Sequence, residues 1–330
     1  MRALIPFFTV IVLVLLAFAG VKMANLHYLF GVLIPYAALA IFITGFIYRV
    51  WQWGRSPVPF RIPTTCGQME SLPWIKQNKL ENPSTTGWVL GRMFLEVFFF
   101  RSLFRNIKTE FREGPKLSYG SDKWLWLAGL AFHWSFLIIL VRHLRFFSLE
   151  VPFVVQIAEG LDSFLQIGAP LLYITNAVIL AAVTFLVIRR FWIPQVRYIS
   201  LPADYFPLFL ILGIATSGIF MRYFQKVHVV GVKELAMGLV SFSPVIPEGI
   251  GSIFFIHLFL VSILFAYFPF SKLMHMGGVF LSPTRNLANN SRAVRHINPW
   301  NYPVHVHTYE QYEDDFREKM KKAGIPVEKE

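Results

Sequence analysis

The sequence predicts an all-α integral membrane protein, a bundle of about six transmembrane helices. Two features of its composition support this fold class. Hydrophobic residues make up 55% of the 330 residues and charged residues only 15%, whereas about a quarter of a soluble domain is charged. Phenylalanine alone accounts for 34 residues. In addition, six apolar runs approach or exceed the roughly 20 residues that a helix needs to cross a bilayer.

The six runs follow one another along most of the chain. The first ends in Ala17-Phe18-Ala19, which also fits a cleaved signal peptide, but its apolar stretch is longer than a usual signal peptide core. We therefore expect it to stay in the membrane. The predicted spans are Leu4–Val21, Tyr28–Tyr48, Trp124–Phe146, Phe164–Ile188, Tyr205–Met221 and Gly251–Leu273.

These spans divide the chain into five parts. Residues 1–24 form an extra N-terminal helix and residues 25–50 a second one. Residues 51–122 are a loop, 123–281 a four-helix core and 282–330 a polar tail. We expect the tail to dock on a partner subunit through its charged helix, Tyr309–Lys322, because so polar a segment cannot fold alone.

Lysine and arginine orient the bundle, because they are enriched on the cytoplasmic side of membrane proteins. The chain has 31 of them against 19 Asp and Glu, a net charge of +12. They are concentrated in the 51–122 loop, after the fourth span and in the tail. We therefore expect a multi-pass protein of the cytoplasmic membrane with both termini in the cytoplasm. Charge placed between apolar runs is no sign of nucleic-acid binding.

Within the loop, residues Thr86–Glu110 mix aromatic and basic side chains. This pattern is typical of an amphipathic helix lying among lipid headgroups with its basic side toward anionic lipid. Either a membrane anchor or a partner site fits it. The single cysteine, Cys66, excludes an intrachain disulfide, covalent c-type haem attachment and a Cys-ligated iron–sulfur cluster in this chain. We expect Cys66 to be a small loop residue.

Four of the nine histidines lie within or at the ends of predicted spans: His133 and His143 on the third, His257 and His275 on the sixth. Ionisable groups at this depth are costly and commonly functional. A hydrogen bond to a neighbouring helix could explain one of them, but hardly two on each of two helices. Neutral imidazole can ligate a metal without bringing a net charge into lipid.

Histidines on facing helices can supply both axial ligands of a haem iron. The third and sixth spans are antiparallel, so the early histidine of one meets the late histidine of the other. We expect the pairs His133/His275 nearer the cytoplasm and His143/His257 nearer the outer face. Two b-type haems would then lie between the third and sixth helices.

The two histidines on the third span are closer together along the helix axis than the two on the sixth. His257 and His275 are 18 residues apart, about 27 Å in a straight helix, whereas His133 and His143 are separated by about 15 Å. We expect tilt or a bend at Pro269 to absorb this difference.

Two other histidine sites have weaker support. His305 and His307 could contribute to a zinc or iron site, although no third ligand is evident nearby. His228, near Arg222 at the outer end of the fifth span, is either an interfacial histidine or a quinone contact.

The sixth span contains HLFL from His257 and FPFSKLMH ending at His275. It resembles the last helix of the gamma subunit of respiratory nitrate reductases, a membrane cytochrome b in which two haem-ligating histidines flank an FPFS-R/K-L segment. The spacing of His133 and His143 is similar to that family's other ligand helix. The resemblance covers roughly residues 28–280 and implies that all four histidines ligate haem iron.

The sequence SPTRN at residues 282–286 and the end of the tail, with KKAGIP at 321–326, resemble one branch of this family. That branch is DsrM, the cytochrome b subunits of Dsr membrane redox complexes of sulfur metabolism. The resemblance implies a cytoplasmic iron–sulfur partner related to heterodisulfide reductase (DsrK type), which serves DsrC. It also implies a multihaem cytochrome c, a ferredoxin-like subunit and a second quinone-interacting membrane subunit.

Arg142 departs from the nitrate reductase pattern, which has a glycine just before this ligand. A cation here could bind a haem propionate or a quinone oxygen, or could be an ordinary interfacial arginine.

We therefore expect an electron-transfer subunit with two haems b that exchanges electrons with menaquinone near His143 and His257. It would have no soluble-substrate active site of its own. The alternatives are a cytochrome of a heterodisulfide reductase-like or nitrate reductase-like complex, and a transporter whose histidines relay protons or bind an ion.

Overall fold

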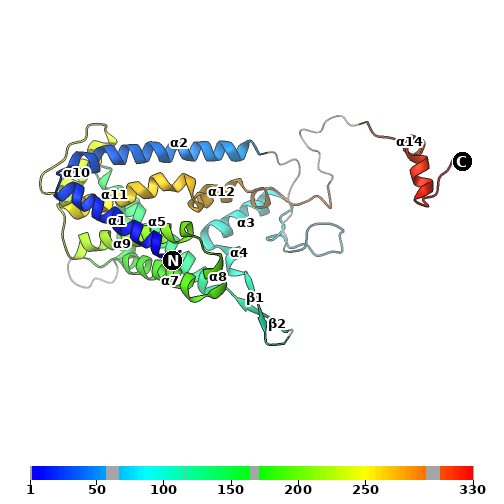
Figure 1. Ribbon diagram of the computed structural model, residues 1–330, viewed down its shortest axis with the longest axis horizontal. Coiled ribbons are helices and arrows are strands. Elements are labelled where there is room, and N and C mark those ends of the chain that lie inside the picture. Colours follow the sequence, from blue (N-terminus) through cyan, green and yellow to red (C-terminus); the bar gives the residue numbers. More distant parts are fainter. Residues whose placement is uncertain (1, 57–66, 115, 164–170, 295–304, 330) are drawn as a thin grey trace.

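The computed structural model describes residues 2–56, 67–114, 116–163, 171–294 and 305–329. It is mostly helical, and Cys66 lies outside the described residues (Figure 1). Within these ranges six helices are long and apolar enough to cross a membrane, which confirms the predicted fold class. They are α1 with Leu4–Lys22, η1–α2 with Leu29–Gly54, α5–η2 with Lys123–Phe146, α7 with Ile174–Trp192, α9 with Pro202–Tyr223 and α11–η3 with Ser252–Phe270.

The second span runs on to Gly54, six residues past its predicted end, and the other spans differ by a few residues. The fourth and sixth spans also differ in form. The fourth begins at Ile174 rather than Phe164, because Tyr173 is extended, and residues 164–170 lie outside the described part. The sixth is interrupted. Helix α11 (Ser252–Tyr267) gives way to the 3-10 turns η3 (Phe268–Phe270) and η4 (Lys272–Met274), then to α12 (His275–Leu281).

The interruption coincides with Pro269, which has no backbone N–H to donate to a helix. Ser271 is extended, with φ −123° and ψ 176°. Helix α2 packs closely against the break, because a Cβ on Gly45 would lie only 2.7 Å from Cβ of Pro269. The expected bend at Pro269 is therefore a full break, and it is packed from the side by a glycine.

The bundle has two ends, which we name after α10 (Val229–Val240) and α12 (Figure 1). Helix α5 packs on α7, α7 on α9, and α11 on α1, α2 and α9. Helices α5 and α11 are not a closely packed pair. Their backbones therefore stand apart, although they carry the four membrane histidines.

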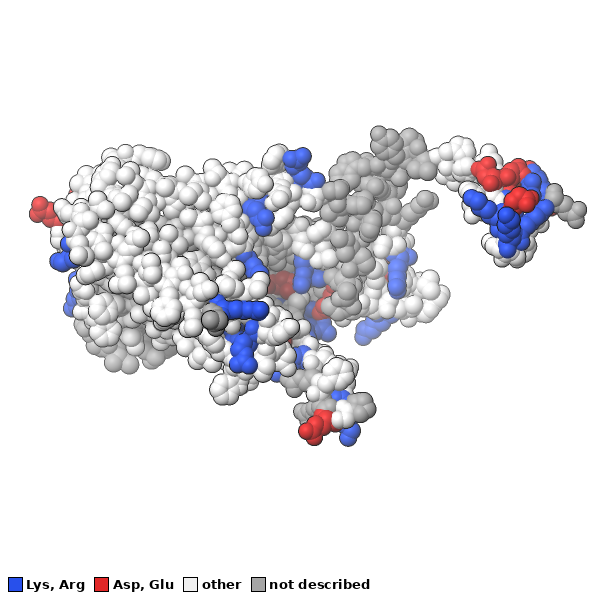
Figure 2. All heavy atoms as spheres, in the orientation of Figure 1, with Lys and Arg blue, Asp and Glu red and all other residues white. Residues whose placement is uncertain are grey.

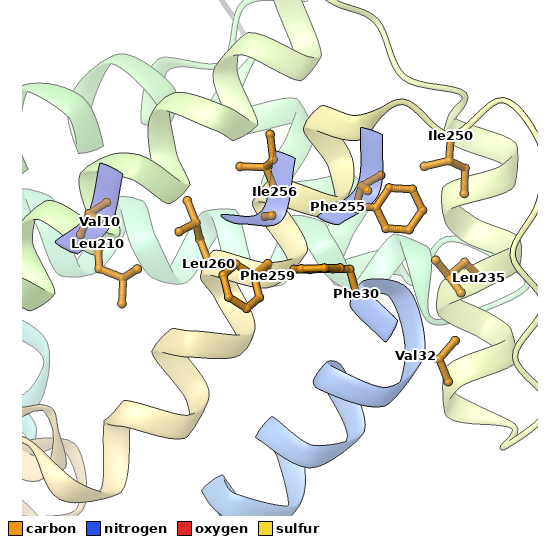
Figure 3. Close-up of a cluster of buried hydrophobic side chains, with 12 residues drawn as sticks. Val10, Phe30, Val32, Leu210, Leu235, Ile250, Phe255, Ile256, Phe259 and Leu260 are labelled. Atoms are coloured by element: carbon orange, nitrogen blue, oxygen red, sulfur yellow. The ribbon is translucent and has the colours of Figure 1, made fainter. Parts of the chain in front are cut away.

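The main core lies where α1, the start of the second span, α9, α10 and α11 meet (Figure 3). Phe30 and Phe259 pack edge to face there, with ring centroids 5.2 Å apart. A second cluster joins α7 to α9 around Val183 and Ile211, with Phe132 and Phe136 of α5 against it. Both clusters lie toward α9, so this helix fixes α5 and α11 relative to each other.

The predicted amphipathic helix is shorter than expected. Helix α3 (Thr86–Phe99) ends at Phe100, which has a left-handed backbone with φ 51°, and α4 (Arg101–Phe104) follows. The prediction that this helix continues to Glu110 is wrong. An antiparallel hairpin, β1 (Ile107–Arg112) with β2 (Lys116–Ser121), begins at Ile107 instead. In α3, Arg92 is only 3% exposed and donates to the carbonyl of Thr284, so its charge does not face lipid.

The first part of the tail packs on the loop of its own chain. Helix α13 (Pro283–Asn286) places Arg285 against Glu96 at 2.9 Å, and Asn289 donates to the side chain of Asn82 at 3.0 Å. Helix α14 (Tyr309–Lys322) forms a separate unit in which the buried Glu313 accepts the backbone N–H groups of Glu328 and Lys329. The docking of the tail on a partner subunit stays a prediction.

Three short helices complete the structure: α6 (Phe153–Asp162), α8 (Pro194–Ile199) and α10. Figure 2 shows that the visible face of the bundle carries few charged side chains, and that many of those in view gather toward the α12 end and on α14. The long apolar surface suits contact with lipid tails.

Candidate functional site

The four membrane histidines lie in two facing pairs. His133 of α5 and His275 of α12 have ring centroids 5.9 Å apart, with an angle of 79° between the ring planes. His143 of α5 and His257 of α11 have centroids 6.4 Å apart and nearly parallel rings, at 11°. The early histidine of one helix therefore meets the late histidine of the other, as antiparallel spans require.

Each of the four imidazoles has its Nδ1 atom bonded to the protein. Three lie against backbone carbonyls: His133 against Gly129 at 2.7 Å, His143 against Ile139 at 2.7 Å and His275 against Lys272 at 2.8 Å. His257 differs, because its partner is the hydroxyl of Ser217 at 2.9 Å. A carbonyl can only accept, so Nδ1 carries the proton, and the lone pair of a neutral ring is on Nε2.

This hydrogen-bond pattern is typical of metal-binding histidines, whose second ring nitrogen donates to a carbonyl or carboxylate. The ring spacing also suits one metal per pair. An imidazole nitrogen binds a metal at about 2 Å, which places two rings on opposite sides of one iron with centroids roughly 6 Å apart. The donor set and spacing therefore fit a bis-histidine haem at each pair. The ligand role itself stays a prediction.

The FPFSK segment holds the backbone that positions His275. Ser271 accepts a hydrogen bond from the N–H of Leu273 and so begins the η4 turn. That turn directs the carbonyl of Lys272 to the ring of His275. The ammonium of Lys272 is fixed in turn by Asp204 of α9, at 2.6 Å. The local sequence thus positions a ligand through backbone geometry.

An aromatic contact that sequence reasoning missed supports His133. The ring of Phe100 packs edge to face on it, with centroids 4.9 Å apart. Two tryptophans of α5 fix this α3–α4 junction, because Trp126 donates to the carbonyl of Phe99 and Trp134 to that of Phe98. A left-handed backbone is strained for a bulky residue such as phenylalanine, and such strain is common near functional sites. Nothing in the local sequence indicates the left-handed backbone at Phe100.

Two neighbouring residues of α9 that were also missed contact His257. Ser217 accepts from its Nδ1, and a Cβ on Gly218 would lie 3.3 Å from its Cε1 atom. The available signal was a Ser-Gly pair in the middle of an apolar span.

Arg142 lies beside the second pair and has protein partners. Its guanidinium forms an ion pair with Asp162 at 3.0 Å and donates to Asn176 at 3.1 Å. It also packs over the ring of Tyr173, at 3.8 Å from the centroid. Arg142 is only 8% exposed, so it is not an ordinary interfacial arginine. Its Nε atom makes no hydrogen bond with the described residues.

The other histidines that the structure describes do not pair across two membrane spans. His305 and His307 contact each other, with ring centroids 4.8 Å apart. In the part of the chain that the structure describes, no three His, Cys, Asp or Glu side chains gather as a metal site would need. His228 is exposed and precedes α10, so its quinone role stays a prediction. His296 lies outside the described residues.

Comparison with known proteins identifies the family. Residues 93–296, which include all four paired histidines, match the model of the nitrate reductase gamma subunit. The chain is 46% identical over 279 residues to the Hdr-like menaquinol oxidoreductase cytochrome b-like subunit of Archaeoglobus fulgidus, covering 82% of this chain and 83% of the relative. It is 42% identical over 285 residues to the protein of the same name from Archaeoglobus profundus, covering 84% of each. The chain therefore belongs to the nitrate reductase gamma subunit family.

Proposed function

We propose that this protein is a dihaem cytochrome b subunit that transfers electrons between a menaquinone pool and a cytoplasmic iron–sulfur subunit. One observation carries the proposal: two histidine pairs, in which every ring has Nδ1 hydrogen-bonded to the protein and its Nε2 makes no hydrogen bond with the described residues. The names of the two relatives, both called menaquinol oxidoreductase subunits, support the quinone.

A bound haem supplies one-electron oxidation and reduction. The chain contributes the axial imidazoles, His133 with His275 and His143 with His257, and an apolar bundle that keeps water away. His133 lies midway along α5 and His143 at its end, about 15 Å further along the helix. The two pairs therefore divide the path across a hydrocarbon core of about 30 Å. A single site would leave too long a distance for rapid transfer.

The α12 end faces the cytoplasm in this proposal. Arg49 and Arg55 at the end of α2, and Arg189 and Arg190 at the end of α7, lie at that end. Their position is the one expected from the enrichment of Lys and Arg on the cytoplasmic side. The His133–His275 pair is then nearer the cytoplasmic partner, and menaquinol reacts near the His143–His257 pair.

Arg142 is the residue we assign to the outer cofactor or the quinone. Asp162 pairs with its Nη1 atom and Asn176 accepts from Nη2, whereas Nε and Nη1 make no hydrogen bond with the described residues. Nε is therefore available to donate to a propionate or a quinone oxygen. The ion pair with Asp162 offsets the cost of holding this charge inside the protein.

At a finer level, we propose a Dsr-type complex linked to dissimilatory sulfur metabolism, with a heterodisulfide reductase-like subunit as the direct partner. The tail sequences SPTRN and KKAGIP support this branch. The second of them continues from α14. Purification of the tagged chain from native membranes tests the branch. Recovery of nitrate reductase catalytic subunits instead would contradict it.

The first test of the redox role is a pyridine haemochrome assay on the detergent-purified chain, with haem counted per polypeptide. We expect about two b-type haems, both reduced by a menaquinol analogue. Well-folded protein without haem would contradict the proposal and favour a transporter in which the histidines relay protons.

A further inference from the structure

We propose that Ser217 and Gly218 of α9 position the imidazole of His257, and that they thereby set the reduction potential of the haem bound by His143 and His257. This inference rests on the proposed function. It concerns a helix, α9, that supplies none of the four histidines.

The hydrogen bond from His257 to Ser217 has a defined direction. The hydroxyl of Ser217 donates to the carbonyl of Ile214 at 3.0 Å, as serines in helices commonly do. Its proton is therefore engaged, and the oxygen is left to accept from Nδ1–H of His257. Ser217 is 7% exposed, so water does not readily replace it.

Gly218 makes room for the same ring. A Cβ at this position would lie 3.3 Å from Cε1 and 3.7 Å from Nδ1 of His257. The first distance is tighter than ordinary van der Waals contact, so any larger residue would push the imidazole away from α9. Two adjacent residues thus determine the position of one ring, one by attraction and the other by its lack of a side chain.

This arrangement distinguishes His257 from the other three histidines. His133 and His143 bond to carbonyls four residues earlier on α5, and His275 to a carbonyl three residues earlier. Those acceptors move with the ligand's own segment. Among the four, His257 alone has its acceptor on another helix, so the packing of α9 on α11 controls its orientation.

The chemical consequence follows from ligand basicity. Donation from Nδ1–H makes Nε2 a stronger ligand, which stabilises the oxidised iron and lowers the reduction potential. Losing the acceptor removes that effect and frees the ring to rotate. Effects of such supporting residues commonly begin at about tenfold, which equals a rise of about 59 mV for a one-electron couple.

The experiment is a redox titration of the purified full chain with Ser217→Ala, Ser217→Thr and Ser262→Ala. The Ser262 variant is a matched control, because Ser262 is 3% exposed, lies on α11 and donates to the carbonyl of Leu258 on its own helix. We expect Ser217→Ala to raise the reduction potential of one haem by about 59 mV, which is a tenfold change in the equilibrium constant for its reduction. Ser217→Thr keeps the hydroxyl and should have the potential of the unmodified chain. The potential of the other haem should be the same in all three variants.

A second pair of variants tests the role of Gly218. Gly218→Ala should broaden the low-spin ferric spectrum of the same haem. Gly213→Ala should not, because its Cβ would meet only the flexible ends of Leu260 and Val10, at 3.4 Å. The affected haem is identified as the one that His257→Ala removes.

The outcomes separate the two proposals. If the unmodified chain binds no haem, the proposed function fails. If it binds two haems and Ser217→Ala titrates like Ser262→Ala, only the role of Ser217 is overturned. If Gly218→Ala has the same low-spin ferric spectrum as Gly213→Ala, only the role of Gly218 is overturned.

Discussion

The two histidine pairs are built by different means. The His133–His275 pair is supported by helix ends and irregular backbone: the left-handed Phe100, the break at Pro269 and the turn begun by Ser271. The His143–His257 pair joins the last residue of α5 to the interior of α11, and the ring of His257 is supported by Ser217 and Gly218 of α9. Irregular backbone thus supports the first pair, whereas two residues of a neighbouring regular helix support the second. We expect substitutions to affect the two pairs separately.

The largest effect should come from the histidines themselves. His143→Ala and His257→Ala should each lose the same haem and leave the other, while His133→Ala and His275→Ala should lose the second one. A haem held by one imidazole instead of two loses half of its axial ligation. Haem counting and low-spin spectra of the four variants check this. Loss of different haems from His143→Ala and His257→Ala would show that the pairing is wrong.

A smaller effect, confined to the His133–His275 pair, is expected from Phe100→Ala. Removing the ring that packs on His133 admits water, which favours the charged ferric state and lowers the potential. We expect a change of about threefold in the equilibrium constant, roughly 30 mV in a redox titration.

Phe99→Ala is the control for this variant, because Phe99 directly precedes Phe100, is the last residue of α3 and is 48% exposed. Equal shifts from the two variants would mean that the ring of Phe100 has no particular role. A shift of both haems by Phe100→Ala would contradict the separate construction of the pairs.

A modest loss of stability on the same side should follow substitution of Asp204. Its carboxylate accepts the N–H of Leu201 at the start of α9 and pairs with Lys272. Asp204→Ala removes both interactions and should cost about 1–2 kcal/mol. Lys272→Met should cost at most about 1 kcal/mol, because pairs with an exposed lysine contribute little. The Lys272 side chain is 79% exposed.

Thermal unfolding in detergent, followed by circular dichroism and by haem absorbance, measures both costs. On heating, the haem at His133–His275 should leave first in Asp204→Ala. Earlier loss of the other haem would disagree with the role of Lys272 in positioning His275.

The smallest expected effect on either pair comes from the tail. Backbone donation from Glu328 and Lys329, with Arg317 nearby, lowers the pKa of Glu313. A lowered pKa means that the stabilisation is present above the unfolded value of about 4.3. It is lost as the pH falls through the lower folded value.

Hydrogen exchange of the backbone N–H groups of Glu328 and Lys329, corrected for intrinsic rates, should therefore accelerate in acid. At neutral pH it should accelerate in Glu313→Gln, with Glu318→Gln as the exposed control. Both haems should keep their potentials. A shifted potential would mean that the tail contacts the bundle.

Much of the fold was predictable because composition and hydropathy determine membrane spans. The six apolar runs appear as six helices, and the four histidine rings pair as antiparallel spans require. The proline at position 269 indicated an irregularity in the sixth span, and the helix is interrupted there. These signals depend on single residues or on short runs, so the sequence alone displays them.

Features set by tertiary contacts were not predictable. The left-handed backbone at Phe100 opposes the ordinary preference of phenylalanine, and it is fixed by Trp126 and Trp134 across a helix interface. The hairpin after α4 replaces a predicted helix, since the sequence there is too short and mixed to show a period. The protein partners of Arg142 lie on other elements, so its sequence position did not indicate them.

The antiparallel pairing has a consequence for biosynthesis. Both histidines of α5 leave the ribosome before either of their partners, and more than a hundred residues separate His143 from His257. Translation at about 5–20 residues per second leaves them unpartnered for roughly 6–30 s. Cofactor capture must therefore wait until the last span enters the membrane, and His275, which follows His257, completes the set.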